Sequence, residues 1–334
     1  MRINQLAKTI AVAHAINRPL MIWGPPGVGK SSVVHQYAQG LGLPVLDWRL
    51  TLCDAVDMRG TPRERDGWTY WAPPVELKLD PKSKGIMFLD ELAQARMEVK
   101  NVAAMLVLER RIGEWKLPEG WWIVSASNRM GDAAGTSPMP KHLDNRFWHQ
   151  EVEVSLDDWL VWADAADVDY RVVAYLKYRP TALMSFDPRS KEAAFASPRT
   201  WHMLSDAVRG FEERKLLDED PVVVGEWFSG IVGNGYGREF TGFLRTMASL
   251  VSIEQILLDP MSAPLSHDPS VNYALATALA AQVDRSSIDA AFSYLHRVGK
   301  EHSFVFAKKV ENIQPNLRKT KAFVGFCAMH ADYI

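Results

Sequence analysis

The first half of the chain alternates short apolar runs with segments of helical periodicity. Four short segments are rich in apolar side chains and lie at 20–23, 44–50, 85–89 and 121–126, and a fifth segment at 150–154 is strand-like. Their lengths and their glycine, proline or polar boundaries are typical of strands, whereas residues 3–17 and 92–108 repeat apolar positions with helical spacing. Strands that alternate with helices predict a parallel sheet that is covered by helices on both faces.

The second half has a different pattern, because the strand signal fades after residue 156 and helical spacing dominates. A stretch rich in proline and serine, residues 258–269, divides this helical part. We therefore expect three segments: an α/β domain over 1–154, a helical domain over 155–257 and a helical C-terminal extension over 258–334.

Two tryptophan-rich stretches interrupt the α/β pattern. Residues 61–74 contain Asp66-Gly67, a favourable hairpin turn, followed by alternating aromatic residues. Residues 110–122 place Gly113 between short apolar segments, which predicts a second hairpin. Both stretches are expected to be insertions in the α/β domain.

Composition narrows the class of protein. The chain has 334 residues, of which 47% are hydrophobic and 23% charged, as in a globular protein with a substantial core. Its two cysteines are far apart in the sequence, so neither a disulfide framework nor a zinc site is indicated. The chain lacks both a run of about 18 apolar residues and a secretion-type start, so we expect a cytoplasmic protein without a membrane span. The formal net charge of −2 does not indicate nucleic acid as a partner.

One stretch carries the clearest chemical signal. Residues 24–31 read G-P-P-G-V-G-K-S between an apolar run and a helical segment. In such a phosphate-binding loop, backbone amides, the helix N-terminus and the lysine attract phosphate, and the serine hydroxyl ligates Mg²⁺. An accidental glycine turn is the alternative, and the strand–helix context argues against it. The residues expected to bind a nucleoside triphosphate are Gly24, Pro25, Pro26, Gly27, Val28, Gly29, Lys30, Ser31 and Ser32.

Two acids end the third apolar run, about sixty residues after Lys30. Ligands of open α/β sheets bind at the carboxyl ends of the strands, so Asp90 and Glu91 are expected to face the phosphate-binding loop. Asp90 would hold Mg²⁺ with Ser31, and Glu91 would orient and polarise the water that attacks the γ-phosphate. The alternative is that both acids only begin the next helix, where negative charge is favourable.

Three further polar residues are candidates for the same site. Asn128 follows the next apolar run and would hydrogen-bond the γ-phosphate or the attacking water, although asparagine after a strand is also a common turn former. Arg146 would reach the γ-phosphate of a neighbouring subunit as an arginine finger, and a surface salt bridge is its alternative. Arg199 begins a helix, where a cation opposes the helix dipole and therefore indicates a phosphate partner.

In this order the motifs resemble those of the AAA+ ATPases. Walker A, Walker B, sensor 1, the arginine finger and sensor 2 correspond to Gly24–Ser31, Gly85–Glu91, Asn128, Leu143–Phe147 and Ser197–Thr200. Features that resemble the MoxR-type branch are Asp57-x-x-Gly60-x-Pro62, Glu109–Glu114 with Pro118, and Ser127–Arg129. The resemblance covers residues 1 to about 206 and does not extend to the C-terminal third.

The resemblance implies a P-loop AAA+ core that binds ATP and Mg²⁺, followed by a mostly helical lid and a helical C-terminal extension. Its site residues would be Lys30, Ser31, Asp90 and Glu91 as the hydrolytic core, Asn128 as sensor 1, Arg146 acting in trans and Arg199 coupling the lid to the nucleotide. Members of this branch form hexameric rings whose insertions, here 61–74 and 110–122, line the pore. They remodel or activate a partner protein complex in a chaperone-like way, commonly with a protein that bears a von Willebrand A domain.

Two other functions stay open on the sequence alone. A nucleotide-gated scaffold with slow turnover is the first, and intact Glu91 and Arg146 argue against it. A nucleic-acid-linked AAA+ motor or loader is the second, and neither the net charge nor a recognisable DNA-binding motif favours it. Of the tryptophans in the insertions, Trp68 and Trp71 would either grip a substrate segment or pack across their hairpin.

Overall fold

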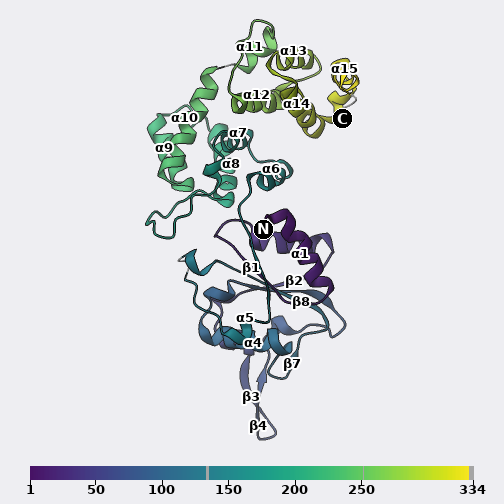
Figure 1. Cartoon of the computed structure of the whole chain (residues 1–334), viewed down its shortest axis with the longest axis vertical. Helices are drawn as coiled ribbons and strands as arrows, with labels where there is room; N and C mark the ends of the chain where they lie inside the picture. Colours follow the sequence, from purple (N-terminus) through teal and green to yellow (C-terminus); the bar gives the residue numbers. More distant parts are fainter. Residues whose placement is uncertain (133–134, 251, 331–334) are drawn as a thin grey trace. The chain divides into compact units, whose positions relative to one another are not determined.

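The computed structural model describes residues 1–132, 135–250 and 252–330 (Figure 1). The chain forms two compact units. Unit 1 consists of Met1–Asp158, Phe186–Lys191 and Ser197–Arg199, and unit 2 of Trp159–Ser185, Glu192–Ala196 and the chain from Thr200 onward. Unit 1 is an α/β structure and unit 2 is helical, so the expected fold class, a parallel α/β core followed by helices, is confirmed. The division of the helical part into a lid and an extension stays a prediction.

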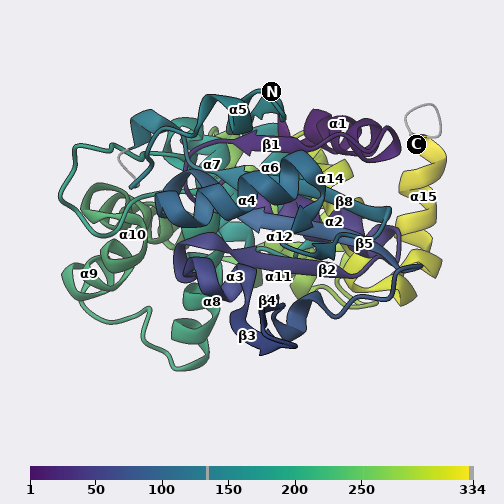
Figure 2. The same ribbon diagram turned by 90° about the horizontal axis from the view of Figure 1, so that it is seen from below.

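Unit 1 is built on a five-stranded parallel sheet in the order β2-β5-β8-β1-β9. The strands are β1 (Leu20–Trp23), β2 (Val45–Arg49), β5 (Lys84–Asp90), β8 (Gly120–Ser127) and β9 (Trp148–Glu151), and Figure 2 shows β1, β8, β5 and β2 together. Trp23 is level with Ser127 in the register, and Asp90 is level with Ala126. The carboxyl ends of β1, β5 and β8 therefore meet at one edge of the sheet.

Helices cover both faces of this sheet. On one face, Met87 and Leu89 of β5 share a hydrophobic cluster with Leu106 of α4 (Met97–Glu109). On the other face, Trp122 of β8 lies against rings from α1 (Ile3–Ala15) and α2 (Lys30–Gly40). The remaining short helices of unit 1 are α3 (Ala55–Arg59) and α5 (Lys141–Asp144), with 3-10 turns η1 (Leu50–Leu52), η2 (Val75–Leu77), η3 (Leu92–Gln94) and η4 (Met130–Asp132). Burial of the sheet on both faces explains the continuous apolar runs in the sequence.

Two elements differ most from their expected bounds, whereas the others shift by at most two residues at an end. The strand expected at 150–154 is β9 at Trp148–Glu151, because its partner β1 has only four residues to pair with it. The helix expected over 92–108 begins only at Met97, after η3 and an extended segment. The backbone of Ala93 bonds Ser127 and Ser137 instead of continuing a helix.

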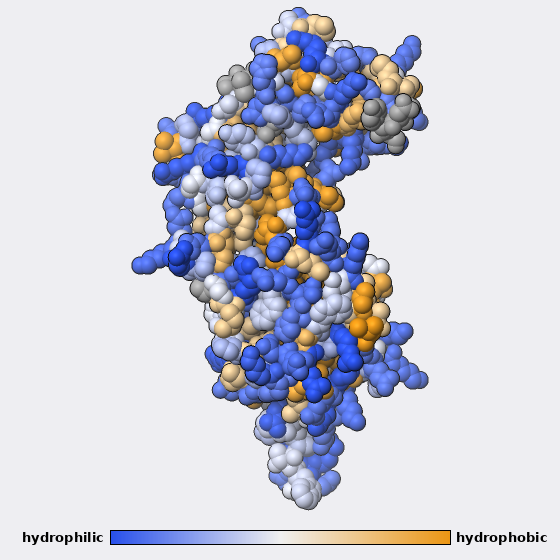
Figure 3. Space-filling model, in the orientation of Figure 1, coloured by the Kyte–Doolittle hydropathy of each residue, from blue (hydrophilic) through white to orange (hydrophobic). Residues whose placement is uncertain are grey.

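Both tryptophan-rich stretches contain hairpins. β3 (Thr61–Arg65) pairs antiparallel with β4 (Trp68–Ala72) around Asp66-Gly67, whose φ angles of 54° and 77° suit the two-residue turn. β6 (Arg111–Ile112) pairs with β7 (Trp115–Lys116). In Figure 3 the β3–β4 hairpin is coloured from white to blue, so its surface ranges from intermediate to hydrophilic on the hydropathy scale.

Unit 2 is formed by helices that pack around two aromatic groups. The helices of this part of the chain are α6 (Leu156–Ala165), α7 (Tyr170–Tyr178), α8 (Pro198–Glu213), α9 (Pro221–Val232), α10 (Asn234–Leu250), α11 (Ile253–Leu258), α12 (Pro269–Gln282), α13 (Ile288–Val298), α14 (Lys300–Ile313) and α15 (Lys321–Met329). One group surrounds Tyr175 and Trp201, and the other surrounds Phe292 and Phe306. Among the residues that the structure describes, no helix combines the length and apolar character needed to cross a membrane.

Candidate functional site

The phosphate-binding loop connects β1 to α2 and depends on two glycines. Gly27 and Gly29 have φ angles of 80° and 95°, a left-handed conformation that glycine adopts without a steric penalty. A Cβ atom on Gly27 would also lie 2.8 Å from the hydroxyl of Ser197. The glycine pattern in the sequence therefore reflects both the turn and the close approach of another segment.

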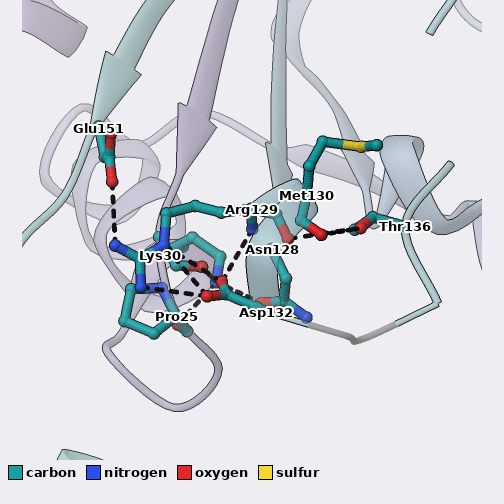
Figure 4. A network of polar contacts seen from close by, with 9 residues as sticks. Pro25, Lys30, Asn128, Arg129, Met130, Asp132, Thr136 and Glu151 are labelled. Atoms are coloured by element: carbon teal, nitrogen blue, oxygen red, sulfur yellow. Dashed lines mark hydrogen bonds and ion pairs between the residues drawn. The ribbon is translucent and has the colours of Figure 1, made fainter. Parts of the chain in front are cut away.

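Lys30 is a buried charge at the start of α2, with 9% of its surface exposed. Its ammonium donates to the carbonyl oxygens of Gly24 at 2.8 Å and Pro25 at 3.0 Å, and to Oδ1 of Asn128 at 2.8 Å (Figure 4). Burial lowers the pKa of Lys30 to about 8, although the nearby charges of Asp90 and Asp132 act in the opposite direction. Lys30 and Asn128, far apart in the sequence, thus share one site.

Ser31 and Asp90 form the second pair of this site. The hydroxyl of Ser31 donates to Oδ2 of Asp90 at 3.0 Å, and Asp90 is 5% exposed. Burial raises the pKa of the Asp90 carboxyl above its usual range, against the hydrogen bond from Ser31. Hydroxyl and carboxylate oxygens this close together are the type of donor set that Mg²⁺ prefers, so the residues fit the ion that the sequence implies.

Glu91 lies at a sharp turn directly after β5. Its φ of 60° is unusual for a residue with a side chain, and such conformations concentrate at functional sites. The backbone N–H of Glu91 bonds the carbonyl of Ala126 at 2.8 Å, and its carboxylate accepts a hydrogen bond from the hydroxyl of Thr51. Thr51 is not among the residues expected from the sequence, although it follows the second strand and the strand-end argument applies to it equally.

A second polar network, which the sequence pattern did not indicate, lies beside Asn128 (Figure 4). Arg129 makes two-pronged contacts with Asp132, including Nη2 to Oδ1 at 3.1 Å, and its Nη1 donates to Glu151 of β9 at 3.0 Å. These bonds raise the pKa of the Arg129 guanidinium, chiefly through Asp132. These bonds connect the start of the loop after β8 to β9. In the sequence, the charged residues that follow Asn128 were the available signal for this network.

The two other candidate arginines differ in position. The backbone N–H of Arg199, in the first turn of α8, donates to the carbonyl of Gly27 at 3.3 Å, and its charge contributes to the lowered pKa of Lys30. Arg146 is exposed in the turn after α5, where its backbone N–H bonds the carbonyl of Leu143 at 3.0 Å. The structure thus brings the backbone of Arg199 to the phosphate-binding loop. The backbone of Arg146 bonds within the turn after α5 instead.

Part of the chain is similar in sequence to a much longer protein. No protein-family model matches the chain. It is 30% identical over 178 residues to the protein named Midasin from Giardia intestinalis; this match covers 50% of the chain and spans 4% of the length of that relative.

Two solved structures illustrate the structural matches. NtrX from Brucella abortus in complex with ADP is 17% identical, with a TM-score of 0.41, over 93% of this chain and 68% of that one. A point mutant of RuvB from Thermotoga maritima is 15% identical, with a TM-score of 0.41, over 74% of this chain and 68% of that one.

Proposed function

We propose that the chain is an ATPase that converts ATP and water to ADP and phosphate. The observation that carries this proposal is the meeting of Lys30, Ser31, Asp90 and Asn128 within hydrogen-bond distance at the carboxyl ends of three strands. The loop amides and Lys30 would bind the phosphates, and Ser31 and Asp90 would hold Mg²⁺, which neutralises phosphate charge when bound. The other loop residues, Gly24–Gly29 and Ser32, would surround the phosphates.

Glu91 and the two candidate arginines would complete the site. Glu91 would orient the water for attack, and Asn128 would bond the γ-phosphate or that water. The backbone bond from Arg199 to Gly27 holds Arg199 beside the phosphate-binding loop and supports a contact with the nucleotide. The exposure of Arg146 supports a contact with the nucleotide of a neighbouring subunit rather than its own.

We further propose that the chain is an AAA+ ATPase of MoxR type that forms a ring, with six subunits as in that branch, and remodels a partner protein complex in the cytoplasm. The order of the motifs and the exposed Arg146 support this assignment. A protein with a von Willebrand A domain is the partner that the resemblance indicates. Nucleic acid is not part of the proposal.

ATP hydrolysis by the purified chain with Mg²⁺ tests the proposed activity. Glu91→Gln should keep nucleotide binding and lose at least about 100-fold in turnover, since it removes the residue that polarises the water. Equal rates for the wild type and this variant would remove Glu91 from the mechanism. The same variant, held in ATP, can be imaged for ring symmetry and tested for binding to a partner.

The β3–β4 hairpin is the proposed contact with the remodelled protein. Trp68 is 79% exposed, whereas Trp71 is covered by the guanidinium of Arg59, whose Cζ lies 3.9 Å from the ring centroid. Exposure supports a substrate contact for Trp68, and the stacked Arg59 supports packing for Trp71. Trp68→Ala should reduce remodelling and leave basal hydrolysis intact, and unchanged remodelling would contradict the contact.

One observation favours a second candidate, the nucleotide-gated scaffold with slow turnover. The hydroxyl of Thr51 donates a hydrogen bond to the Glu91 carboxylate, which is the group that must polarise the attacking water. While this bond holds, basal hydrolysis is expected to be slow. Removal of the Thr51 hydroxyl distinguishes the ATPase from the scaffold. Hydrolysis should become faster only if the chain is an ATPase that this bond restrains.

A further inference from the structure

Lys100 is a buried charge that the proposed reaction does not use. It lies in α4 with no exposed surface, and its ammonium donates to the carbonyl of Ala93 at 2.8 Å and to the carbonyl and hydroxyl of Ser137 at 2.9 and 2.6 Å. All three acceptors are neutral, and burial lowers the pKa of Lys100. Burial of a cation among neutral groups is costly, so stability alone does not explain a lysine here.

The first acceptor belongs to the turn that carries Glu91. Ala93 is two residues after Glu91, and its N–H donates to the hydroxyl of Ser127 at 2.9 Å, next to Asn128 at the end of β8. Its carbonyl accepts from Lys100 on the other side. The turn is therefore held between β8 and α4.

The second acceptor belongs to the segment that leads to Arg146. The N–H of Ser137 donates to the carbonyl of Ala93 at 2.9 Å, the same oxygen that Lys100 contacts. Ser137 is followed by Met139 and Leu143, which are buried in the main cluster of unit 1. Hydrogen bonds to the carbonyl of Ala93 and to both oxygens of Ser137 require a donor group with several hydrogens. A protonated lysine has three.

We propose that Lys100 is a positioning residue for hydrolysis. It fixes the turn that directs Glu91 and joins that turn to the segment of Ser137, so that Glu91 meets the attacking water from a defined place. This inference rests on the proposed ATPase function. Small displacements of reacting groups have large effects on rate, so turnover should depend on Lys100 more strongly than binding does.

The test compares single-turnover hydrolysis of radiolabelled ATP by the wild type and Lys100→Met. Methionine has a similar length and no donor, so it should pack in the same place and leave Ala93 and Ser137 without the hydrogen bonds from the ammonium. We expect turnover to fall about 10- to 100-fold and the dissociation constant for fluorescent ADP to stay within about twofold. Lys8→Met, at an exposed lysine of α1, is the matched control and should leave turnover unchanged.

Repeating the substitution in the Glu91→Gln background separates positioning from general damage. If Lys100 acts through Glu91, Lys100→Met should change turnover there by less than about twofold. A loss of the same factor in both backgrounds would overturn the inference, as would wild-type turnover by Lys100→Met. If this variant does not fold, Ser137→Ala removes one acceptor and should lower turnover about three- to tenfold with unchanged ADP binding.

The same experiments separate this inference from the proposed function. A wild-type chain that binds ADP and does not hydrolyse ATP would contradict both. Hydrolysis that depends on Glu91 and not on Lys100 or Ser137 would support the ATPase and contradict only the role of Lys100.

Discussion

Two buried cations, Arg171 in unit 2 and Lys30 in unit 1, have different kinds of partner. In unit 2, Arg171 donates to Asp169 through Nε at 2.9 Å and Nη2 at 2.8 Å, and to Glu212 through two bonds of 2.8 Å. In unit 1, the ammonium of Lys30 is bonded to loop carbonyls and to Asn128. In the first, closed arrangement, carboxylates of the protein neutralise the cation. In the second, open arrangement, the bonded partners are neutral and the positive charge remains available for an anionic ligand.

The pKa values of the two cations shift in opposite directions for this reason. Burial acts to lower the pKa of Arg171, but the hydrogen bonds to Asp169 and Glu212 outweigh it and the pKa is raised. Burial dominates at Lys30, whose pKa is lowered to about 8. A buried charge whose bonded partners are neutral marks a binding site more clearly than a buried ion pair does.

The largest effect is expected when Arg171 is removed from its ion pairs with Asp169 and Glu212. Arg171→Met removes the close ion pair of Asp169, which is 4% exposed, and leaves it a longer contact with Arg209, whose Nε lies 3.9 Å from its Oδ2. We expect the free energy of unfolding to fall by about 3 kcal/mol or more, because removal of one partner strands a buried charge. Urea unfolding measures the loss, while ADP affinity of the folded variant should stay unchanged. A change below about 1 kcal/mol would show that the pair contributes little.

The second prediction concerns Lys30, whose hydrogen-bond partners are neutral. Lys30→Met should weaken ATP binding about 100-fold, or about 2.8 kcal/mol, because the phosphates lose a full positive charge. Its free energy of unfolding without nucleotide should fall by less than that of Arg171→Met, because the partners of Lys30 are neutral and the desolvation cost of the buried cation is removed with it. Calorimetric titration with ATP and urea unfolding give both quantities. Destabilisation as large as that of Arg171→Met would mean that the partners of the two cations make no difference to stability.

A third prediction concerns a half-buried lysine of unit 2. The ammonium of Lys177 lies 3.3 Å from the ring centroid of Tyr273, and burial lowers its pKa to about 8, against the charge of Asp164 and together with that of Lys309. The folded state then binds this proton less tightly than the unfolded state, whose pKa is near 10.5. The stability of the wild type should therefore rise relative to Lys177→Met between pH 8 and about 10.5.

Because Lys177 is only half buried, solvent screening reduces this effect to about 1 kcal/mol. Urea unfolding of both proteins at about pH 7.5 and about pH 10 gives the difference, and the other titrating groups cancel in the comparison. A difference that does not change with pH, or that changes with the opposite sign, would contradict the direction of the shift.

The smallest expected effect concerns Thr51. Thr51→Val removes the hydroxyl that occupies the Glu91 carboxylate and keeps the shape of the side chain. Basal ATP hydrolysis should rise about threefold, the size of one modest hydrogen bond. Thr9→Val, at a half-buried threonine of α1, is a matched control. A fall in rate would mean that Thr51 orients Glu91 for attack and does not restrain it.

The sequence by itself determined the strands, the phosphate-binding loop and the acids at the end of β5. These features are local: a buried parallel strand needs a continuous apolar run, and a phosphate-binding loop needs glycine where φ is positive. The pattern also placed Asn128 at a strand end, from which its contact with Lys30 follows once the strand order is known.

Only the tertiary structure decided which distant residues meet. Thr51, Arg129 and Lys100 each contact a partner on another segment of unit 1, and their neighbours in the sequence do not identify that partner. The contact of Arg199 with Gly27 likewise joins segments that are far apart in the sequence. The physical reason is that hydrogen bonds to buried oxygens depend on the register and packing of whole elements, whereas glycine turns and apolar runs are properties of a few neighbouring residues.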